Sequence, residues 1–276
     1  MLRVMKEDVT HTNQRIWFAQ DIALEYAREQ TPVPAEAAIL HQLGNTLNHA
    51  SVLDIGIGAG RTTAFLAPAC KDYVGIDYSQ AMIDIATARF PDIPLHQQDA
   101  RDLSAFAEAS VDIVWFSYNG IDYVSHADRI KILHEIRRVL KPNGLFIFSS
   151  HNRDDNIYPA YHWKNLPLSV NPKRMARRVI CYLAGIINAT KHRAQQIQTD
   201  DYAILNDQAH EYNMLTYYIS GEKQIEQLAA AGFAVEGLWG MKGEKLREDE
   251  VYVGGYSIYY LAYSMEKNQI NQSFFD

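Results

Sequence analysis

The sequence has few cysteines, no long apolar run and no excess of positive charge. Cys70 and Cys181 form no CxxC pair, which indicates free thiols in a reducing cytoplasm rather than a disulfide or zinc framework. No run of about 18 apolar residues is present, which excludes a transmembrane helix. The polar start predicts no secretory signal. With 33 acidic and 26 basic residues the net charge is −7, which argues against a general nucleic-acid-binding role.

The sequence does contain enough apolar residues for a sizeable core. Hydrophobic residues make up 47% of the 276 positions and charged residues 21%, proportions typical of a folded domain. The length suits one α/β domain with an insertion. The chain shows no internal repeat, and it opens with two expected helices, over 14–29 and 35–48.

After these helices, expected strands and helices alternate. Such alternation predicts a mostly parallel sheet covered on both faces, with ligands bound at the carboxyl ends of the strands. The expected strands are 52–55, 73–76, 95–97, 111–116 and 145–149, and the expected helices are 61–67, 80–89 and 127–140.

The loop in VLDIGIGAGRTT (52–63) lies at such a strand end. Its glycines give G-x-G-x-G rather than the G-x-G-x-x-G of a dinucleotide site, and Arg61 follows them directly. Asp54 would repel a phosphate but suits a cationic ligand. S-adenosylmethionine carries a sulfonium and an amino group and no phosphate, so Asp54 would hold its methionyl amine, directly or through water. The alternative is an ordinary tight turn between a strand and a helix.

Three further residues fit a nucleoside. Asp77 ends the second strand in VGIDYSQAMI, where a carboxylate accepts hydrogen bonds from ribose hydroxyls. Met82 would lie against the adenine, or simply belong to the core. Asp99, in QQDARDL, would accept from the adenine amino group, or be a solvated loop residue.

Five stretches together resemble the class I S-adenosylmethionine-dependent methyltransferases. They are VLDIGIGAG (52–60), VGIDYSQAMI (74–83), QQDARDL (97–103), VDIVWFSYNGIDYV (111–124) and IRRVLKPNGLFIFSS (136–150). The later YYISGEKQIEQLAAAGF is similar to the family's closing helix, before a strand pair at 235–241 and 256–263. The resemblance implies an α/β, doubly wound, Rossmann-like fold. Its seven-stranded sheet would be mostly parallel with the last strand antiparallel, with N-terminal helices and an insertion after the fifth strand.

The resemblance also implies how the chain and its cofactor are organised. We expect one domain made of an N-terminal helical cover (1–48), a cofactor-binding half (50–150), a substrate-binding insertion (152–219) and a closing helix with its strand pair (220–264). The N-terminal cover would place Tyr26 or Trp17 near the methionyl group. The residues expected to bind S-adenosyl-L-methionine are Asp54, Gly56, Gly58, Gly60, Asp77, Tyr78, Met82, Asp99, Ala100, Arg101, Ser117 and Tyr26.

Methyl transfer is an in-line displacement that needs positioning more than a nucleophile or a metal. His151, just after the fifth strand, is a candidate general base, with shaping of the loop or pocket as the alternative. Tyr118, Asn119, Asp122 and Tyr123 would line the acceptor side. Asp122, Asp154, Asp155 and Asn156 could alternatively hold a divalent metal ion for a catechol acceptor, but we expect no metal.

Absent motifs narrow the acceptor class. The family's amino-methylating nucleic-acid enzymes carry Asn/Asp-Pro-Pro-aromatic after the fourth strand, and this chain has Ser117-Tyr118-Asn119-Gly120 there. The cysteine needed for cytosine C5 chemistry is also missing from that place. We therefore expect a small-molecule acceptor methylated on oxygen or nitrogen. A non-methylating S-adenosylmethionine-binding protein or an aminopropyl transferase is the competing class.

The region 156–199 contains seven Lys or Arg residues and no Asp or Glu. Its apolar residues recur at helical spacing, which predicts a basic helical cover over the acceptor pocket. In this interpretation Arg174, Arg177 and Arg178 attract a small anionic acceptor. One alternative is peripheral contact with a membrane surface that presents a lipid-like or quinone acceptor. Another is a solvated helix face without a ligand.

Overall fold

The protein is described by a computed structural model over residues 9–17, 31–155, 170–206 and 212–266. The helices are α1 (Val9–Trp17), α3 (Pro34–Leu43), α4 (Thr63–Leu66), α5 (Gln80–Arg89), α6 (His126–Val139), α7 (Pro172–His192) and α8 (Gly221–Ala230). The strands are β1 (Ser51–Ile55), β2 (Asp72–Asp77), β3 (Leu95–Gln97), β4 (Val111–Phe116), β5 (Leu140–Asn152), β6 (Ile197–Gln198), β7 (Tyr202–Asn206), β8 (Leu215–Ile219), β9 (Phe233–Gly240), β10 (Lys245–Leu246) and β11 (Ser257–Ser264).

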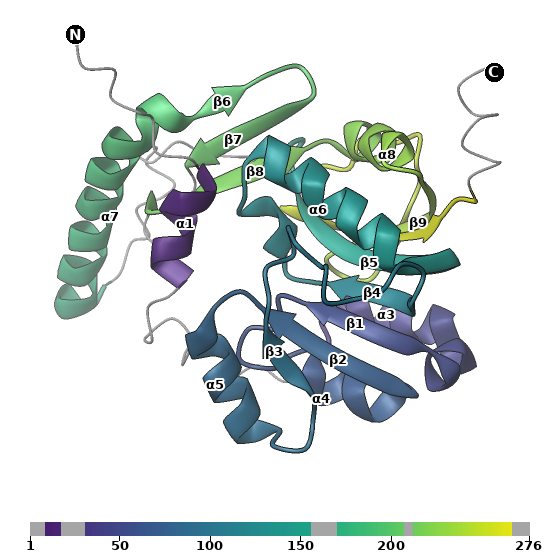
Figure 1. Ribbon diagram of the computed structural model, residues 1–276. Coiled ribbons are helices and arrows are strands. Elements are labelled where there is room, and N and C mark those ends of the chain that lie inside the picture. Colours follow the sequence, from purple (N-terminus) through teal and green to yellow (C-terminus); the bar gives the residue numbers. More distant parts are fainter. Residues whose placement is uncertain (1–8, 18–30, 156–169, 207–211, 267–276) are drawn as a thin grey trace, which may run out of the picture.

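All of these strands join one sheet, whose main order is β10-β9-β11-β5-β4-β1-β2-β3 (Figure 1). The pairs β4–β5, β1–β4, β1–β2 and β2–β3 are parallel, whereas β11 runs antiparallel to both β5 and β9. The expected doubly wound sheet with an antiparallel last strand is therefore confirmed. The seven strands β1–β5, β9 and β11 form its core, and β6, β7, β8 and β10 extend it to eleven in the described residues.

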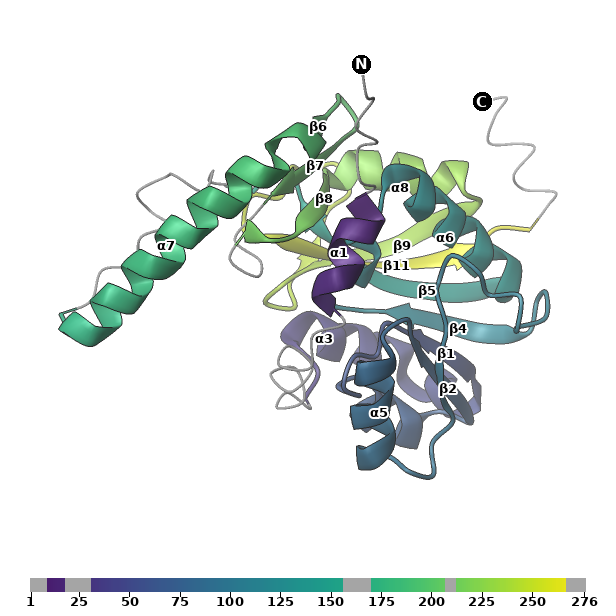
Figure 2. The same ribbon diagram turned by 60° about the vertical axis from the view of Figure 1, so that its left-hand side comes forward.

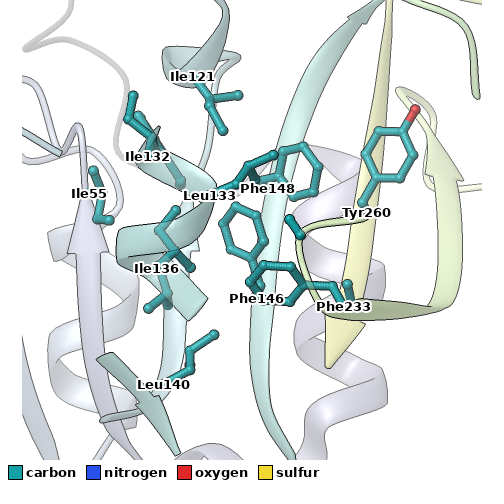
Figure 3. Packing of buried hydrophobic residues seen from close by; sticks show 14 of the residues in the cluster. Ile55, Ile121, Ile132, Leu133, Ile136, Leu140, Phe146, Phe148, Phe233 and Tyr260 are labelled. Carbon is teal, nitrogen blue, oxygen red and sulfur yellow. The ribbon is translucent and has the colours of Figure 1, made fainter. Parts of the chain in front are cut away.

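Alternate side chains of the central strands enter two separate cores. On one face, Phe146 and Phe148 of β5 stack 4.4 Å apart and pack with Ile132, Leu133 and Ile136 of α6 (Figure 3). Ile147, which lies between these two phenylalanines, and Trp115 of β4 point to the other face. There they pack with Ile39 of α3 and Leu66 of α4. Period-two alternation with both faces buried is the pattern of a sheet covered by helices on either side.

The insertion adds strands at the carboxyl end of β5. Strand β8 runs parallel to β5 there, with His151 opposite Tyr218 and Asn152 opposite Ile219. Strands β7 and β6 continue antiparallel from β8. Helix α7 precedes them and extends away from the sheet (Figure 2). The insertion therefore builds on the edge where ligands bind in such sheets.

Three expected helices have different bounds in the structure. The first begins at Val9 rather than at residue 14, because Val9 and Asn13 are buried against the β8 region; residues 18–30 lie outside the described ranges. The second ends at Leu43, because Gly44 takes φ +50° and the chain continues as a 3₁₀ helix. The helix after the glycine loop is only Thr63–Leu66, followed by a 3₁₀ turn that contains a proline.

In the part of the chain that the structure describes, none of the helices combines the length and the apolarity needed to cross a bilayer.

Candidate functional site

A pocket opens at the carboxyl ends of β1, β2 and β4. It brings together the loops that follow these strands, the start of α5 and one side of α1. Of the residues expected to bind cofactor or acceptor, those lining it are Gly56, Gly58, Asp77, Tyr78, Met82, Asp99, Ala100, Arg101, Ser117, Tyr118 and Tyr123. The others lie behind it, elsewhere, or outside the described residues.

The glycine loop needs its glycines for two different reasons. Gly56, Gly58 and Gly60 all have positive φ, at +68°, +55° and +86°, a region that side chains other than glycine rarely adopt. A Cβ on Gly56 would come within 2.8 Å of the Phe116 ring, and one on Gly60 within 2.7 Å of the Phe90 ring. A Cβ on Gly58 would meet nothing within 4 Å, so this glycine leaves its backbone open toward the pocket.

Asp77 ties the glycine loop to the second strand. Its Oδ2 accepts from the Gly58 N–H at 2.9 Å, and its Oδ1 accepts from the Ser79 N–H at 2.8 Å. Burial raises the pKa of Asp77 to about 6, although both backbone hydrogen bonds act to lower it. A carboxylate offers about four acceptor positions. Asp77 therefore keeps capacity for further hydrogen-bond donors at the pocket wall.

Asp54 lies behind the loop and is fully buried. Its Oδ2 accepts from the Tyr73 hydroxyl at 2.7 Å, and its Oδ1 has no hydrogen-bond partner. Burial raises the pKa of Asp54 to about 7. A buried oxygen without a partner is costly, so this position favours a donor or a cation that completes it.

Arg61, which follows the glycines, forms an ion pair that the sequence analysis missed. Its guanidinium donates to both oxygens of Glu36 on α3, at 2.7 and 2.6 Å, and Glu36 is fully buried. Ser117 donates to the same carboxylate at 2.6 Å and accepts from Trp115 Nε1 at 2.6 Å. Arg61 also lies over the Tyr118 ring, 4.4 Å from its centroid. The ion pair thus joins α3 to the loops after β1 and β4.

The sequence around Glu36 indicates only one role for this residue, which is to cap the start of a helix. Glu36 is the third residue of a helix that starts with Pro34, and its side chain caps that helix by accepting from the Val33 N–H at 2.9 Å. Helix capping alone does not point to a site. Its link to Arg61 depends on a contact across 25 residues, which sequence spacing does not reveal.

Asp99 differs from the expectation of a free acceptor for adenine. Arg101 donates to both of its oxygens, with the closest contact at 2.7 Å. Burial alone would raise the pKa of Asp99, but the hydrogen bonds from Arg101 outweigh it and lower the pKa. Arg101 also reaches Asp128 at 3.1 Å, and Thr10 of α1 donates to that same Asp128 oxygen at 2.6 Å. Asp99 lines the pocket as one end of this chain of contacts.

Helix α1 forms part of the pocket wall through Thr10 and Gln14. It is held there by Asn13, whose side chain donates to the carbonyls of Tyr123 and Leu215 and accepts from the Leu215 N–H at 3.0 Å. The structure therefore places N-terminal residues at the pocket. Trp17 is the last residue of α1, but its side chain and all of Tyr26 lie outside the described residues.

The turn after β4 has an unusual backbone. Tyr118 and Asn119 are both left-handed, each with φ +58°. Consecutive left-handed residues other than glycine are strained and concentrate at functional sites. The turn directs Tyr118 to the pocket and over Arg61. Asn119 is buried instead, with its N–H bound to Ser149 Oγ at 2.8 Å and its Oδ1 accepting from Ser257 at 2.6 Å.

His151 and Asp122, 29 residues apart, meet directly. The Nδ1 of His151 lies 2.7 Å from Asp122 Oδ2, and the His151 N–H donates to the same oxygen at 2.6 Å. Asn119 Nδ2 lies 3.2 Å from His151 Nε2. His151 does not itself line the pocket, but its ring packs edge-on against Tyr123, which does, with centroids 6.0 Å apart. One side chain therefore separates the imidazole from the pocket.

Asp122 is fully buried, which corrects the expectation that it contacts the acceptor. Its Oδ1 accepts from Ser150 Oγ at 2.8 Å and pairs with Arg129 of α6. Arg129 is also fully buried and bonds to Gln224 at 2.5 Å and to Gln227 at 2.9 Å. Asp122 therefore holds His151 and is itself held by a buried arginine, so it fits the role of a positioning residue.

The basic residues of α7 are not part of this site. None of Arg174, Arg177 and Arg178 lines the pocket, and α7 extends outward instead of lying across it (Figure 2). In the described residues α7 therefore does not cover this pocket, and contact of its arginines with an acceptor stays a prediction. Among the described residues no group of three His, Cys, Asp or Glu side chains is placed to hold a metal ion, and Asn156 lies outside those residues.

Comparison with known proteins finds a family match over the residues of the glycine loop and Asp77. Residues 52–144 match the family described as "Methyltransferase domain". Similar curated proteins include demethylmenaquinone methyltransferase of Renibacterium salmoninarum, 32% identical over 143 residues that cover 50% of this chain and 59% of that protein. A probable S-adenosylmethionine-dependent methyltransferase of Mycolicibacterium smegmatis is 30% identical over 102 residues, which cover 37% of this chain and 38% of that protein. These matches thus span between about two fifths and three fifths of the relatives.

Solved structures agree at the level of the fold. The 1,6-didemethyltoxoflavin-N1-methyltransferase of Burkholderia thailandensis, crystallised with S-adenosylhomocysteine, aligns with a TM-score of 0.56 at 13% identity and covers 93% of this chain and 88% of its own. The CcbJ methyltransferase of Streptomyces caelestis aligns with a TM-score of 0.55 at 14% identity and covers 90% and 96%. The glycine loop and Asp77 lie within the matched residues 52–144 at one edge of the sheet. This part of the chain therefore matches the methyltransferase domain family, and the fold is the Rossmann-like fold of class I methyltransferases.

Proposed function

We propose that this protein transfers the methyl group of S-adenosylmethionine to an oxygen or nitrogen atom of a small-molecule acceptor. The observation that carries the proposal is the pocket at the strand ends, which is lined by an open glycine loop and Asp77, with the unpartnered Asp54 oxygen buried behind the loop. The family match covers the same residues. The relatives named above act on different acceptors, so they support a small molecule without identifying it.

The residues present fit this cofactor. The amino group of the methionyl moiety would supply the hydrogen-bond donor that Asp54 Oδ1 lacks, directly or through water. The remaining acceptor positions of Asp77 would take the ribose hydroxyls, while Gly58 leaves room for close approach. Met82 offers an apolar side chain at the pocket wall for the adenine.

When bound, the sulfonium supplies an already activated methyl group. The protein then has to align the acceptor with it and exclude water, and good alignment contributes on the order of 7–11 kcal/mol to lowering the barrier. Tyr118 and Tyr123 are the pocket residues beyond the cofactor loops that fit an acceptor wall. Tyr118 belongs to the strained turn after β4, and Tyr123 follows the short 3₁₀ helix Gly120–Asp122.

For an acceptor that must lose a proton, we propose His151 as the general base and Asp122 as its positioning residue. A carboxylate at Nδ1 holds the tautomer in which Nε2 has a free lone pair. This Nε2 lies 3.2 Å from the Asn119 amide nitrogen, and hydrogen bonds of this kind often rearrange when substrate binds. In the alternative, His151 only shapes the wall behind Tyr123.

The class of activity is tested with methyl-labelled S-adenosylmethionine and a fractionated pool of small metabolites. Methyl transfer produces S-adenosylhomocysteine and a labelled acceptor in equal amounts. An aminopropyl transferase would instead use decarboxylated S-adenosylmethionine and release methylthioadenosine, and a non-methylating binding protein would release neither product. Either of these two results would refute the proposal.

The role of His151 is tested once an acceptor is known. If His151 is the base, His151→Gln lowers kcat about 10²–10⁴-fold and leaves KM for the acceptor within a few-fold. The rise of the rate with pH should also disappear in the variant. A wall-shaping role predicts the reverse pattern, with KM raised and the pH profile unchanged. Tyr123→Phe is the matched control for packing against the imidazole.

A lipid-like acceptor is the second candidate, and one observation favours it. Helix α7 exposes a row of aliphatic side chains next to basic ones, which suits contact with a lipid surface.

A further inference from the structure

Helix α7 carries two rows of apolar side chains that lie about a quarter turn apart around its axis, one half-buried and one exposed. The inner row, on the inner face of the helix, consists of the half-buried Met175, Val179 and Ile186. Gly185 is buried on this face, where an added Cβ would come within 2.7 Å of the Tyr212 ring. This face is therefore the one that packs on the protein.

The outer face carries a second row that the sequence analysis did not separate from the first. Ile180 is 66% exposed, Leu183 is 52% exposed and Ile187 is 58% exposed. Spacings of three and four residues put these side chains in one line along a helix. Large aliphatic side chains exposed side by side, rather than singly, mark interaction surfaces.

Basic residues surround this outer row. At 100° per residue, Lys173 and Lys191 lie at its two ends and Arg177 lies beside it, and all three are exposed. From Pro172 to Gln195 the chain has six Lys or Arg residues and no acidic residue, although the whole protein carries a net charge of −7. The outer face is thus both the most apolar and the most positive exposed helix surface among the described residues.

We propose that the outer face of α7, formed by Ile180, Leu183 and Ile187 with Lys173, Arg177 and Lys191, docks on an anionic lipid surface. A helix with an apolar stripe and flanking lysine and arginine lies in the plane of such a surface, because the aliphatic side chains enter the acyl region and the long basic side chains reach the headgroups.

Charge decides between a lipid surface and a second copy of the chain. A two-fold pairing of α7 stripes would bring the basic residues of both copies together without an acidic residue from either helix. An anionic lipid surface instead carries the charge opposite to that of Lys173, Arg177 and Lys191 on the outer face. Helix α7 extends away from the sheet (Figure 2), and the exposure of Ile180, Leu183 and Ile187 shows that this row is not covered by the core.

The test is co-sedimentation of the full chain with vesicles of phosphatidylcholine and phosphatidylglycerol at 7:3, compared with phosphatidylcholine alone. We expect binding to the anionic vesicles that weakens as salt is raised. The variant Lys173→Glu/Arg177→Glu/Lys191→Glu should lower the partition coefficient on the order of 100-fold or more, because each basic residue near an anionic surface contributes about a factor of five.

Two further variants control this measurement. Lys71→Glu/Lys242→Glu/Arg247→Glu makes the same change in net charge at exposed positions outside α7, and it should keep most of the binding. In Leu183→Trp, tryptophan emission should shift to the blue on anionic vesicles and be quenched by brominated lipid tails. This second readout needs no loss of binding, so it holds even where the triple variant folds poorly.

Three results would overturn the proposal. The first is no sedimentation of the wild type with anionic vesicles. The second is an equal loss of binding in the control variant, which would show non-specific attraction. The third is a lipid-free dimer that Ile180→Ser/Leu183→Ser/Ile187→Ser dissociates in analytical ultracentrifugation, which would make a second copy the occupant. None of these results bears on methyl transfer in the pocket.

Discussion

On the cofactor side of the pocket, the carboxylates of Asp54, Asp77 and Asp99 are held by partners at most 19 residues away in the chain, whereas on the acceptor side Asn13 and His151 are held by residues farther away. Asp77 accepts from Ser79, two positions away, and Asp99 pairs with Arg101, also two positions away. On the other side, Asn13 bonds to Leu215 across 202 residues. These three carboxylates thus depend on contacts within residues 54–101, whereas the acceptor side joins residues from α1 to β8.

This difference has an energetic consequence. A residue held by its local loop keeps most of its contacts when another part of the fold changes. The acceptor side depends on buried polar groups from β4, β5, α6, α8 and α1, and each of them is costly to leave unpaired. We therefore expect substitutions on the acceptor side to cost more stability than substitutions of the cofactor loops, and the following predictions test that comparison.

The largest effect is expected at Arg129, the fully buried arginine behind His151. Arg129→Met keeps the length of the side chain but leaves Asp122 as an uncompensated buried charge and removes the partner of Gln224. Loss of one member of a buried ion pair costs about 3–5 kcal/mol, which urea denaturation would measure.

Two variants sharpen the result at Arg129. The double variant Arg129→Met/Asp122→Asn should recover part of the lost stability, because the unpaired charge is gone. Arg247→Met removes an arginine from an exposed pair with Asp249 and should change stability by about 1 kcal/mol or less. Equal losses in Arg129→Met and Arg247→Met would contradict the assigned role of the buried network.

These contacts also explain what sequence reasoning found and what it missed. The glycine loop and Asp77 were placed correctly at the pocket because each occupies a set place at a strand end, and the parallel order of the strands brings those ends together. Met82 and Tyr118 also line the pocket, because each lies in the segment that follows a strand end. Whether these residues bind cofactor or acceptor stays a prediction.

The missed residues share a different feature. Glu36, Asn13 and Arg129 belong to helices outside the motifs, and their partners are 25, 202 and 7 residues away along the chain. No spacing rule covers such pairs. A charged residue on the buried face of an expected helix is the one available signal, and Arg129 shows it, since Ile132, Leu133 and Ile136 mark that face of α6.

A second prediction concerns Asn13, which joins α1 to β8 and to the turn after β4. Asn13→Ala leaves the N–H and C=O of Leu215 and the C=O of Tyr123 without this partner. We expect a loss of about 1–3 kcal/mol in the free energy of unfolding, together with faster amide exchange in β8.

A matched control for Asn13 lies on the same helix. His11→Ala changes an exposed side chain of α1, so it should have little effect on either measurement. If Asn13→Ala behaves like His11→Ala, α1 is not needed to hold the acceptor side, and the contrast between the two sides of the pocket is weaker than the contacts indicate.

The smallest effect is expected on the cofactor side. There, we expect binding of the cofactor to release protons from Asp54 and Asp77 to the solvent. Burial raises the pKa of Asp54 to about 7 and that of Asp77 to about 6, so both carboxyls are partly protonated at pH 6 in the free protein. A bound amine near Asp54 and hydroxyl donors at Asp77 favour the ionised forms and lower both pKa values. Binding should therefore release roughly one proton at pH 6 and almost none above about pH 8.5, and affinity should rise with pH across this window.

Calorimetry of S-adenosylhomocysteine binding, in buffers of different ionisation enthalpy, measures this release. Asp54→Asn should remove the part of the release that titrates near pH 7. Asp99→Asn should leave the release unchanged, because hydrogen bonds from Arg101 lower the pKa of Asp99 and keep it ionised at pH 6. Proton uptake on binding, or a release that depends on Asp99 instead of Asp54, would show that the amino group of the cofactor is held elsewhere and that the unpartnered Asp54 oxygen is not its site.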